Sequence, residues 1–143
     1  MPTMRLKKNI KLSLGNHLHD EGMIFGHEVA LQTLVSNLID NAIRYSYENT
    51  AIKITLDEVH KEYILTVIDQ GPGIPEDLRE RVFERFYRII GNQQSGTGLG
   101  LNIVSQIVKL HNAKIELDSP QSGNGLCAKV FFPKPDSIHT QTE

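Results

Sequence analysis

An apolar stripe between His27 and Tyr45 constrains the fold of this chain more than any other feature. Its residues recur at spacings of three and four and therefore share one arc of a helical wheel: Leu31, Leu34, Val35, Leu38 and Ala42. A helix with one apolar side must bury that side against a second layer of structure. The pattern predicts a helix over 27–45 that packs on a sheet.

Segments with strand character supply that sheet. Apolar and polar residues alternate in the first two, and β-branched and aromatic residues are dense in a third, which follows the second after a turn at 57–61. Two further strands are expected near the end of the chain. The predicted strands cover residues 10–14, 51–57, 62–68, 114–118 and 127–132.

Two other segments have helical character. The segment Glu76–Phe86 follows a proline that can stand at the start of a helix, and the apolar residues of 101–108 share one helical face. The predicted fold class is α+β, a two-layer α/β sandwich in which a mixed sheet of about five strands is covered on one face by three helices. We expect one domain over residues 9–133, a linker remnant over 1–8 and a flexible C-terminal tail over 134–143.

The composition of the 143 residues argues against several classes of protein. Fifteen Lys and Arg against seventeen Asp and Glu give a net charge of -2, so there is no overall positive field to hold a nucleic acid or an anionic membrane. Cys127 is the single cysteine, which argues against a disulfide scaffold. The longest apolar runs are far shorter than the ~20 residues of a membrane-spanning helix. We expect a soluble domain that contacts neither nucleic acid nor membrane.

Polar side chains gather on one edge of the first predicted helix, beside the apolar stripe. Four of them fall within an arc of roughly 100°: Asn37, Asn41, Arg44 and Tyr45. Buried amides without partners cost about 1–3 kcal/mol each, and a polar ligand would satisfy them. Amide oxygens suit Mg²⁺, a guanidinium suits phosphate, and a phenol ring can lie against a planar base. Taken alone, the segment is equally typical of a solvated helix flank.

A second candidate element is the turn Asp69–Ile74, which follows a predicted strand. The Asp69 carboxylate could accept a hydrogen bond from an exocyclic amine, while Gly71 and Gly73 let the backbone approach a flat ligand. The same residue types dominate turns of every function, so by itself this segment favours an ordinary turn.

A glycine-rich loop, 96–101, leads into the second amphipathic helix. Glycines with free N–H groups at a helix N-terminus form an anion site, for which phosphate is the natural occupant. The loop lacks the Gly-Lys-[Ser/Thr] ending of a P-loop, and Leu101 stands where a dinucleotide fingerprint needs its third glycine. Such a loop is weak evidence when it stands alone.

The segment 83–88 interleaves two arginines with three aromatic residues. Aromatic side chains could anchor a lid to the body of the domain, and Arg85 or Arg88 could reach a transferring phosphate. Helix packing with solvated arginines explains this hexapeptide equally well.

In chain order, the four segments 37–45, 69–74, 83–88 and 96–101 resemble the N, G1, F and G2 boxes of the catalytic ATP-binding domain of bacterial sensor histidine kinases, which belong to the GHKL family of ATPases. The resemblance extends from about Lys11 to Phe132. Four boxes in the family's order are far more specific than any one of them. The resemblance implies that the chain binds ATP and Mg²⁺.

The resemblance also implies roles for single residues. Asn41 would be a Mg²⁺ ligand, with Asn37 close to the metal and the phosphates. Arg44 stands where the family binds phosphate, and Tyr45 stands where an aromatic ring packs on adenine. Asp69 would accept from the adenine amino group and so select ATP over GTP.

The remaining implied nucleotide contacts lie in loops. Gly71, Gly73 and Ile74 would shape the adenine pocket, and residues 74–95 would form the ATP lid, which carries Arg85, Tyr87 and Arg88. The phosphates would be covered by the loop before the last helix and by its first residues: Gly96, Thr97, Gly98, Leu99, Gly100 and Leu101. No residue of this chain is assigned as a catalytic group.

Asn37 separates the subfamilies. Gyrase-like ATPases carry a water-activating glutamate four residues before the metal-binding asparagine, and here that position holds an amide, which cannot act as a base. We therefore expect slow hydrolysis. In the histidine kinases that the chain resembles, the γ-phosphate passes instead to a histidine on a separate helical dimerisation domain.

The chain departs from the family pattern in two ways. The family's Leu-His-Gly-Gly turn is replaced by Leu110-His111-Asn112-Ala113, which leaves the conformation of that turn open. No phosphoacceptor box is present, and the six histidines are expected on the surface or in packing contacts. The expected partners are thus the histidine-bearing dimerisation domain of the same full-length kinase and, downstream, a response regulator. The expected location is the cytoplasmic part of a membrane-anchored bacterial sensor.

Two alternatives stay open at this point. A degenerate nucleotide-binding module would sense a nucleotide or hold a partner without transferring phosphate. An anti-sigma-factor serine kinase shares the fold and several boxes, although the aromatic and arginine-rich segment 83–88 belongs to the histidine-kinase branch.

Overall fold

A single mixed sheet forms the base of the molecule. The computed structural model describes residues 3–5, 9–87 and 100–135, and its six strands follow the order β1-β2-β3-β4-β6-β5. Strands β2 and β3 are parallel, and the other neighbouring pairs are antiparallel. The strands are β1 (Thr3–Arg5), β2 (Lys11–Asn16), β3 (Ala51–Val59), β4 (Glu62–Ile68), β5 (Lys114–Asp118) and β6 (Cys127–Pro133).

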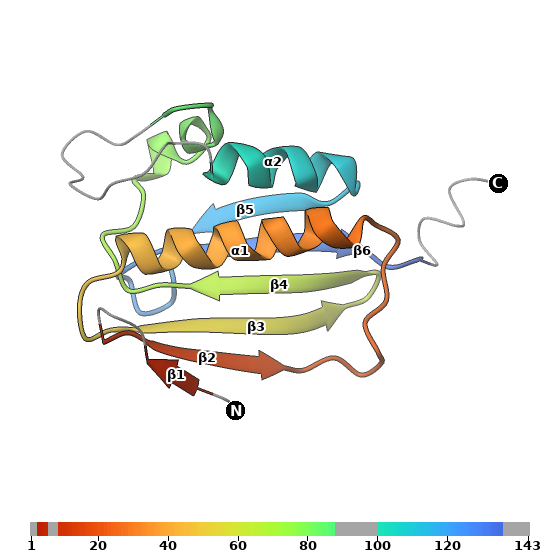
Figure 1. Ribbon diagram of the computed structural model, residues 1–143, viewed down its shortest axis with the longest axis horizontal. Helices are drawn as coiled ribbons and strands as arrows, with labels where there is room; N and C mark the ends of the chain where they lie inside the picture. Colours follow the sequence, from red (N-terminus) through yellow and green to blue (C-terminus); the bar gives the residue numbers. More distant parts are fainter. Residues whose placement is uncertain (1–2, 6–8, 88–99, 136–143) are drawn as a thin grey trace.

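Two α-helices lie across one face of this sheet (Figure 1). They are α1 (Glu28–Tyr45) and α2 (Gly100–Leu110), and they pack against each other as well as against the strands. The side chains that are completely buried come from both layers and fill the space between them: Ile10, Leu34, Ile52, Val104 and Val130. The apolar stripe on α1 therefore faces the sheet, as its spacing predicted.

The chain between β4 and α2 differs from the prediction. An α-helix was expected over 76–86, but the structure has two short 3₁₀ turns, η1 (Glu76–Leu78) and η2 (Arg81–Phe83). Val82 is the one buried residue of these two turns. Without an apolar stripe to pack, a helix of this length is marginal in water, so the segment folds into separate turns.

The start of the chain also differs from the prediction. Three residues of the expected linker, Thr3–Arg5, form β1 and pair with β2. This pairing uses backbone groups, and for that reason the apolar pattern gave no sign of it. The sheet consequently has six strands, where about five were expected, while the predicted fold class is confirmed.

The turn after α2 is resolved without a glycine. Asn112 has a φ of +54°, and the N–H of Ala113 donates to the carbonyl oxygen of Val108 at 2.9 Å. These are features of a Schellman helix end, in which asparagine is the usual substitute for glycine. The departure from the family's paired glycines thus preserves a helix-ending conformation.

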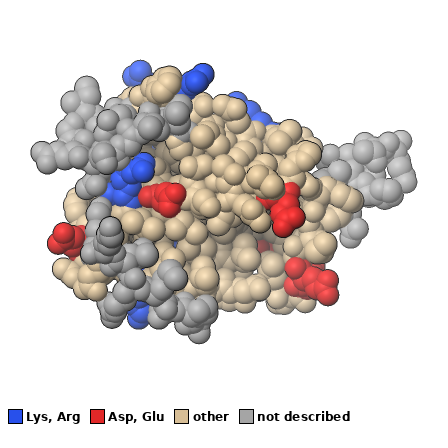
Figure 2. Space-filling model, viewed as in Figure 1, with Lys and Arg blue, Asp and Glu red and all other residues tan. Residues whose placement is uncertain are grey.

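The visible surface carries few charges. On the face in Figure 2, basic and acidic groups are scattered, and uncharged surface lies between them. The coloured part of this face shows no basic patch of the kind that binds a phosphate backbone. In the described ranges, neither helix combines the length and the apolar character needed to cross a bilayer.

Candidate functional site

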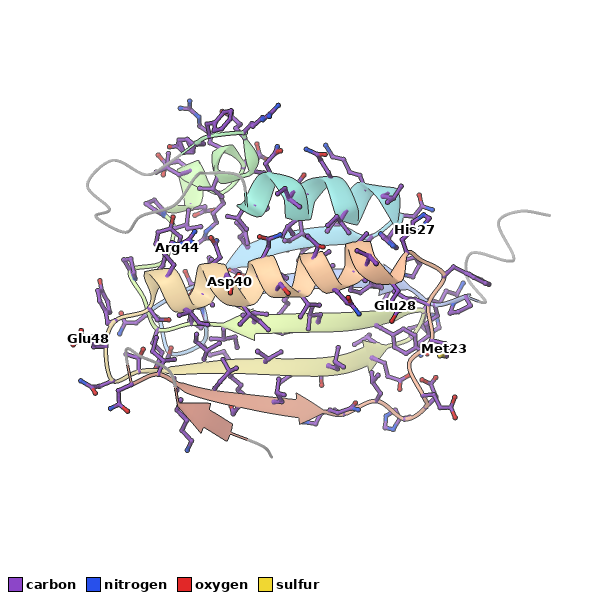
Figure 3. All side chains as sticks on the ribbon, in the orientation of Figure 1. Met23, His27, Glu28, Asp40, Arg44 and Glu48 are labelled. Carbon is purple, nitrogen blue, oxygen red and sulfur yellow. The ribbon has the colours of Figure 1, made fainter. Side chains whose placement is uncertain are left out.

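A cavity opens where α1 ends, α2 begins and β4 reaches its last residue. About 920 Å³ of space free of protein atoms lies within the cavity and its mouth, open solvent included. Its walls combine apolar side chains with a few polar ones, as is usual for small-molecule sites. Figure 3 labels Asp40 and Arg44 on the last turns of α1, at this end of the molecule. The lining residues are Leu38, Asn41, Ala42, Arg44, Tyr45, Val67, Asp69, Pro72, Gly73, Ile74, Val82, Tyr87, Gly100, Leu101, Leu117, Leu126 and Ala128.

Most of the predicted site residues that the structure describes line this one cavity. They come from segments far apart in the sequence: Asn41, Arg44, Tyr45, Asp69, Gly73, Ile74, Tyr87, Gly100 and Leu101. Gly71 and Asn37 lie next to the cavity without lining it. Arg85 is exposed and does not line it. Five predicted residues fall outside the described ranges: Arg88, Gly96, Thr97, Gly98 and Leu99.

Asp69 is a buried carboxylate at the end of β4, with 5% of its surface exposed. Its Oδ1 atom accepts hydrogen bonds from the backbone N–H of Gly71 at 3.0 Å and of Leu126 at 3.1 Å. Burial raises the pKa of Asp69, and these two N–H groups oppose that rise. In the described structure both bonds go to Oδ1, so Oδ2 is left as an acceptor for a ligand.

Glycines allow the backbone around Asp69 to pack this closely. A Cβ atom on Gly71 would collide with the carbonyl oxygen of Tyr45, and one on Gly125 would collide with the carbonyl oxygen of Asp69. Gly125 also has a φ of +106°, which side-chain-bearing residues rarely adopt. The turn at 69–74, the end of α1 and the β5–β6 loop therefore fit together only with hydrogen at these positions.

Two amides of α1 face the first residue of α2. A Cβ atom on Gly100 would lie 3.6 Å from Oδ1 of Asn37 and 3.9 Å from Oδ1 of Asn41. Asn37 also donates through Nδ2 to the carbonyl oxygen of Thr33 at 3.0 Å, which fixes its oxygen toward α2. The two oxygens thus lie beside a helix N-terminus, and Asn41 also lines the cavity; groups of these kinds suit a phosphate and a hard cation. No cluster of three or more His, Cys, Asp or Glu side chains suited to a metal exists in the described ranges.

The segment after η2 closes one side of the cavity. Tyr87 lines the cavity, and the Arg81 guanidinium lies 5.2 Å from the centre of its ring. The carbonyl oxygen of Phe83 accepts from Nδ2 of Asn102 on α2 at 3.0 Å, which ties this segment to the helix layer. Phe86 has a φ of +65° and is 61% exposed, so it points its ring away from the core.

Sequence reasoning missed part of the cavity wall. Leu126 both supports Asp69 and lines the cavity, while Val82, Leu117 and Ala128 line its apolar side. The last three have the ordinary signature of core residues, and nothing marks them as ligand-facing. The Gly123-Asn124-Gly125 run was the available signal, because such a run indicates an unusual backbone.

The cavity offers different chemistry at its two ends. Near Asp69 it has a buried acceptor and apolar walls, which suit a flat heterocycle with an amino group. Toward Asn41, Arg44 and the start of α2 it has amides, a cation and a helix N-terminus, which suit an anion and its counter-ion.

Comparisons with known proteins agree with this arrangement. A family model described as histidine kinase-, DNA gyrase B- and HSP90-like ATPase matches residues 26–136. The chain is 37% identical over 136 residues to the sensor protein kinase PmrB of Pseudomonas aeruginosa, a match that covers 92% of this chain and 28% of PmrB. The chain therefore spans about a quarter of the length of such curated relatives.

Solved structures show the same fold. The catalytic domain of histidine kinase ThkA, in a nucleotide-free form, is 32% identical and superposes with a TM-score of 0.77, covering 90% of this chain and 81% of that one. The cytoplasmic segment of histidine kinase QseC is 27% identical and superposes with a TM-score of 0.62, covering 90% of this chain and 64% of that one.

Proposed function

This chain belongs to the histidine kinase-, DNA gyrase B- and HSP90-like ATPase family, and from that premise we propose that it is the catalytic domain of a two-component sensor histidine kinase. It binds ATP with Mg²⁺ and presents the γ-phosphate to a histidine on a separate dimerisation domain of the same full-length protein. The observation that carries this proposal is the cavity that brings Asn41, Asp69 and Gly100 together from three segments of the chain.

Asp69 selects the base in this proposal. Its Oδ1 is held by two backbone N–H groups, so Oδ2 is available to an exocyclic amine, which adenine carries. Guanine has a carbonyl oxygen at the corresponding position and would face the carboxylate with a second acceptor. Tyr45 and the apolar wall cover the faces of the ring.

Asn41 and Asn37 hold the metal and Arg44 contacts the phosphates in this proposal. The two amide oxygens lie beside Gly100 at the start of α2, where Asn41 lines the cavity, and oxygen ligands of this kind suit Mg²⁺. The metal would offset part of the negative charge on the phosphates. Because Asn37 is an amide, the chain supplies no base at that position to activate water, and bound ATP is preserved for the acceptor histidine.

The proposal also concerns the full-length protein to which this domain belongs. The matched part is 92% of this chain but only 28% of PmrB, and 88% of this chain but only 26% of QseC, so these relatives are roughly three times as long as this chain, which leaves room for a dimerisation domain. We place the domain on the cytoplasmic side of a membrane-anchored sensor, upstream of a response regulator, in keeping with the QseC segment that it resembles. The comparisons support neither a degenerate nucleotide-binding module nor an anti-sigma-factor serine kinase.

Phosphotransfer to a purified dimerisation domain tests the proposal. The acceptor domain from the same full-length protein is incubated with this chain and γ-labelled ATP, and the label should appear on its histidine. At an ATP concentration near the dissociation constant of the unmodified chain, Asp69→Asn should strongly reduce labelling in a chain that still folds. Absence of label with the unmodified chain, although ATP is bound, would instead favour a regulatory nucleotide-binding module.

The metal assignment has its own test. The affinity of the unmodified chain for ATP should rise when Mg²⁺ is added, and Asn41→Ala should remove most of that rise. Equal Mg²⁺ dependence in both proteins, measured by calorimetry, would contradict the assignment of Asn41.

A further inference from the structure

Arg79, between η1 and η2, joins two irregular segments of the cavity wall. Its Nε–H donates to the carbonyl oxygen of Ile74 at 3.0 Å, and its Nη2 donates to Oγ of Ser119 at 2.9 Å. Its Nη1 lies 3.7 Å from Oδ1 of Asp118. The side chain is only 20% exposed, although it belongs to a segment at the surface.

Each of the two segments carries part of the adenine side of the cavity. Gly73 and Ile74 in the first line the cavity, and Asp69 begins that turn. Leu126, at the end of the β5–β6 connection, lines it from the other side, next to Leu117 of β5. The turn at 69–74 and the connection at 119–126 lie beyond the regular pairing of the sheet, which ends at Ile68, Asp118 and Cys127.

Few bonds hold these segments in register with each other. The N–H of Asp69 donates to the carbonyl oxygen of Leu126 at 3.0 Å, and the N–H of Leu126 donates back to the Asp69 carboxylate. Ser119, seven residues before Leu126 along the chain, is tied to the turn at Ile74 through the fork of Arg79. The two segments are thus connected at two places, by the hydrogen bonds between Asp69 and Leu126 and by those of Arg79 to Ile74 and Ser119.

We propose that Arg79 is a positioning residue for the adenine selectivity of this site, which rests on the proposed function. By fixing Ile74 and Ser119 relative to each other, it holds the β5–β6 connection where the Leu126 N–H can orient the Asp69 carboxylate. Arg79 itself does not line the cavity. Loss of the Arg79 side chain therefore changes the orientation of the Asp69 carboxylate and leaves the phosphate side of the site unchanged.

The planar geometry of the Arg79 guanidinium matters more for this connection than its positive charge. Two donors of one guanidinium bind two acceptors on different segments at the same time, and a lysine ammonium on a flexible stem does not reproduce that geometry. The ion pair to Asp118 contributes little, because that carboxylate is 76% exposed.

Competition between ADP and GDP tests the proposal. We expect Arg79→Gln to weaken ADP binding about tenfold, the change produced by loss of a hydrogen bond worth about 1.4 kcal/mol, with GDP binding unchanged. Ser119→Ala should lower the ADP/GDP ratio in the same direction, and adding it to Arg79→Gln should cause no further fall. Arg79→Lys should behave like Arg79→Gln, while Lys109→Gln, which removes an exposed cation from α2, should leave both affinities unchanged.

The outcomes separate this inference from the proposed function. If the unmodified protein prefers ADP and Arg79→Gln keeps the same ADP/GDP affinity ratio, the role of Arg79 is overturned and the proposed function stands. Equal losses for ADP and GDP would also overturn it, because general destabilisation does not distinguish the bases. Unmodified protein that binds neither nucleotide would overturn both proposals. If Arg79→Gln fails to fold, Ser119→Ala decides the question, since its unchanged selectivity would contradict the link.

Discussion

The two ends of the sheet use polar side chains in opposite ways. At the end where α1 begins, which Figure 3 marks with Met23 and His27, polar groups bind one another. The Tyr63 hydroxyl donates to Asp20, and Lys134 forms an ion pair with Glu58, which also accepts from the N–H of His19. At the end where α1 stops, the Asp69 carboxylate, the Asn41 amide and a helix N-terminus instead line an open cavity.

The pKa shifts record the same difference. The N–H of Gly22 and then the Tyr63 hydroxyl lower the pKa of Asp20, and Lys134 and then the N–H of His19 lower that of Glu58. Burial raises the pKa of Asp69. The comparison teaches that the first end is built for stability, whereas the second keeps a desolvated carboxylate that a ligand can use.

A buried histidine joins the two helices at the end of the sheet where α1 begins, which we call the closed end; the cavity end is the open end. His111 contacts the carbonyl oxygen of Ile107 through Nδ1 at 2.8 Å and accepts from the backbone N–H of His27 through Nε2 at 3.0 Å. It thereby joins the end of α2 to the start of α1. His111 is thus one of the packing histidines expected from the sequence.

The largest effect is expected at Gly125, in the open end. Gly125→Ala places a Cβ against the Asp69 carbonyl oxygen and forces a side chain into φ +106°, so unfolding free energy should fall by about 2–5 kcal/mol. Gly123→Ala is the matched control, because its φ of +88° is also left-handed but nothing lies within 4 Å of the new Cβ. It should cost about 1 kcal/mol. Equal losses for the two variants in urea denaturation would contradict the close contact.

The next largest effect is on ATP affinity, which should change in a variant at the cavity end of the sheet and not in one at the opposite end. Asp69→Asn should weaken ATP binding by about 10- to 100-fold, because it replaces a charged acceptor and puts an amide donor group beside two backbone N–H donors. Asp20→Asn, at the closed end, should leave ATP affinity unchanged. Calorimetric titration of the two variants checks this, and a loss of affinity in Asp20→Asn would show that the ends are coupled.

Tyr63→Phe should affect stability without affecting binding. Removal of the hydroxyl leaves the ring in place but deletes the hydrogen bonds to Asp20, so unfolding free energy should fall by about 1–2 kcal/mol. ATP affinity should stay the same. A stability equal to that of the unmodified protein would mean that water replaces the hydroxyl at no cost.

Acidification should act with opposite signs at the two ends. A carboxylate with a lowered pKa stabilises the fold above its unfolded pKa, and that contribution is lost as pH falls through the folded value; this applies to Asp20 and Glu58. Asp69, with a raised pKa, becomes less unfavourable to the fold as pH falls. Stability of Tyr63→Phe should therefore fall less steeply in acid than that of the unmodified protein, and stability of Asp69→Asn more steeply. Identical slopes for all three would contradict these assignments.

The smallest effect tests the turn after α2. Asn112→Gly should change unfolding free energy by only about 0.5 kcal/mol, since glycine adopts φ +54° without strain but loses more entropy on folding. Asn112→Val, which places a β-branched residue in the left-handed region, should destabilise more strongly. Thermal denaturation distinguishes the two, and equal stability would argue against this conformation.

Local patterns predicted the regular elements well. The predicted bounds of β4 and β5 agree with the structure, because alternation and β-branched residues act within a single segment. The expected helix at 76–86 was wrong because helix-forming composition was not matched by an apolar face, and Val82 alone is buried there.

Much of the candidate site could also be predicted, but its supports could not. Asp69, Asn41 and Gly100 stand in recognisable segments, and they meet at one cavity. The Leu126 N–H and the Arg79 fork depend on contacts between loops that are 57 and 40 residues apart, and no local pattern encodes such pairing. Their recognition required the three-dimensional structure.

A crystal structure with Mg²⁺ and a non-cleavable ATP analogue tests the central claim most directly. The measured quantity is the distance between the adenine amino nitrogen and the nearer carboxylate oxygen of Asp69. We predict a hydrogen bond of about 2.7–3.2 Å, with the phosphates between Asn41 and the start of α2. A nucleotide bound elsewhere, or a base whose amino group lies out of reach of Asp69, would contradict the account.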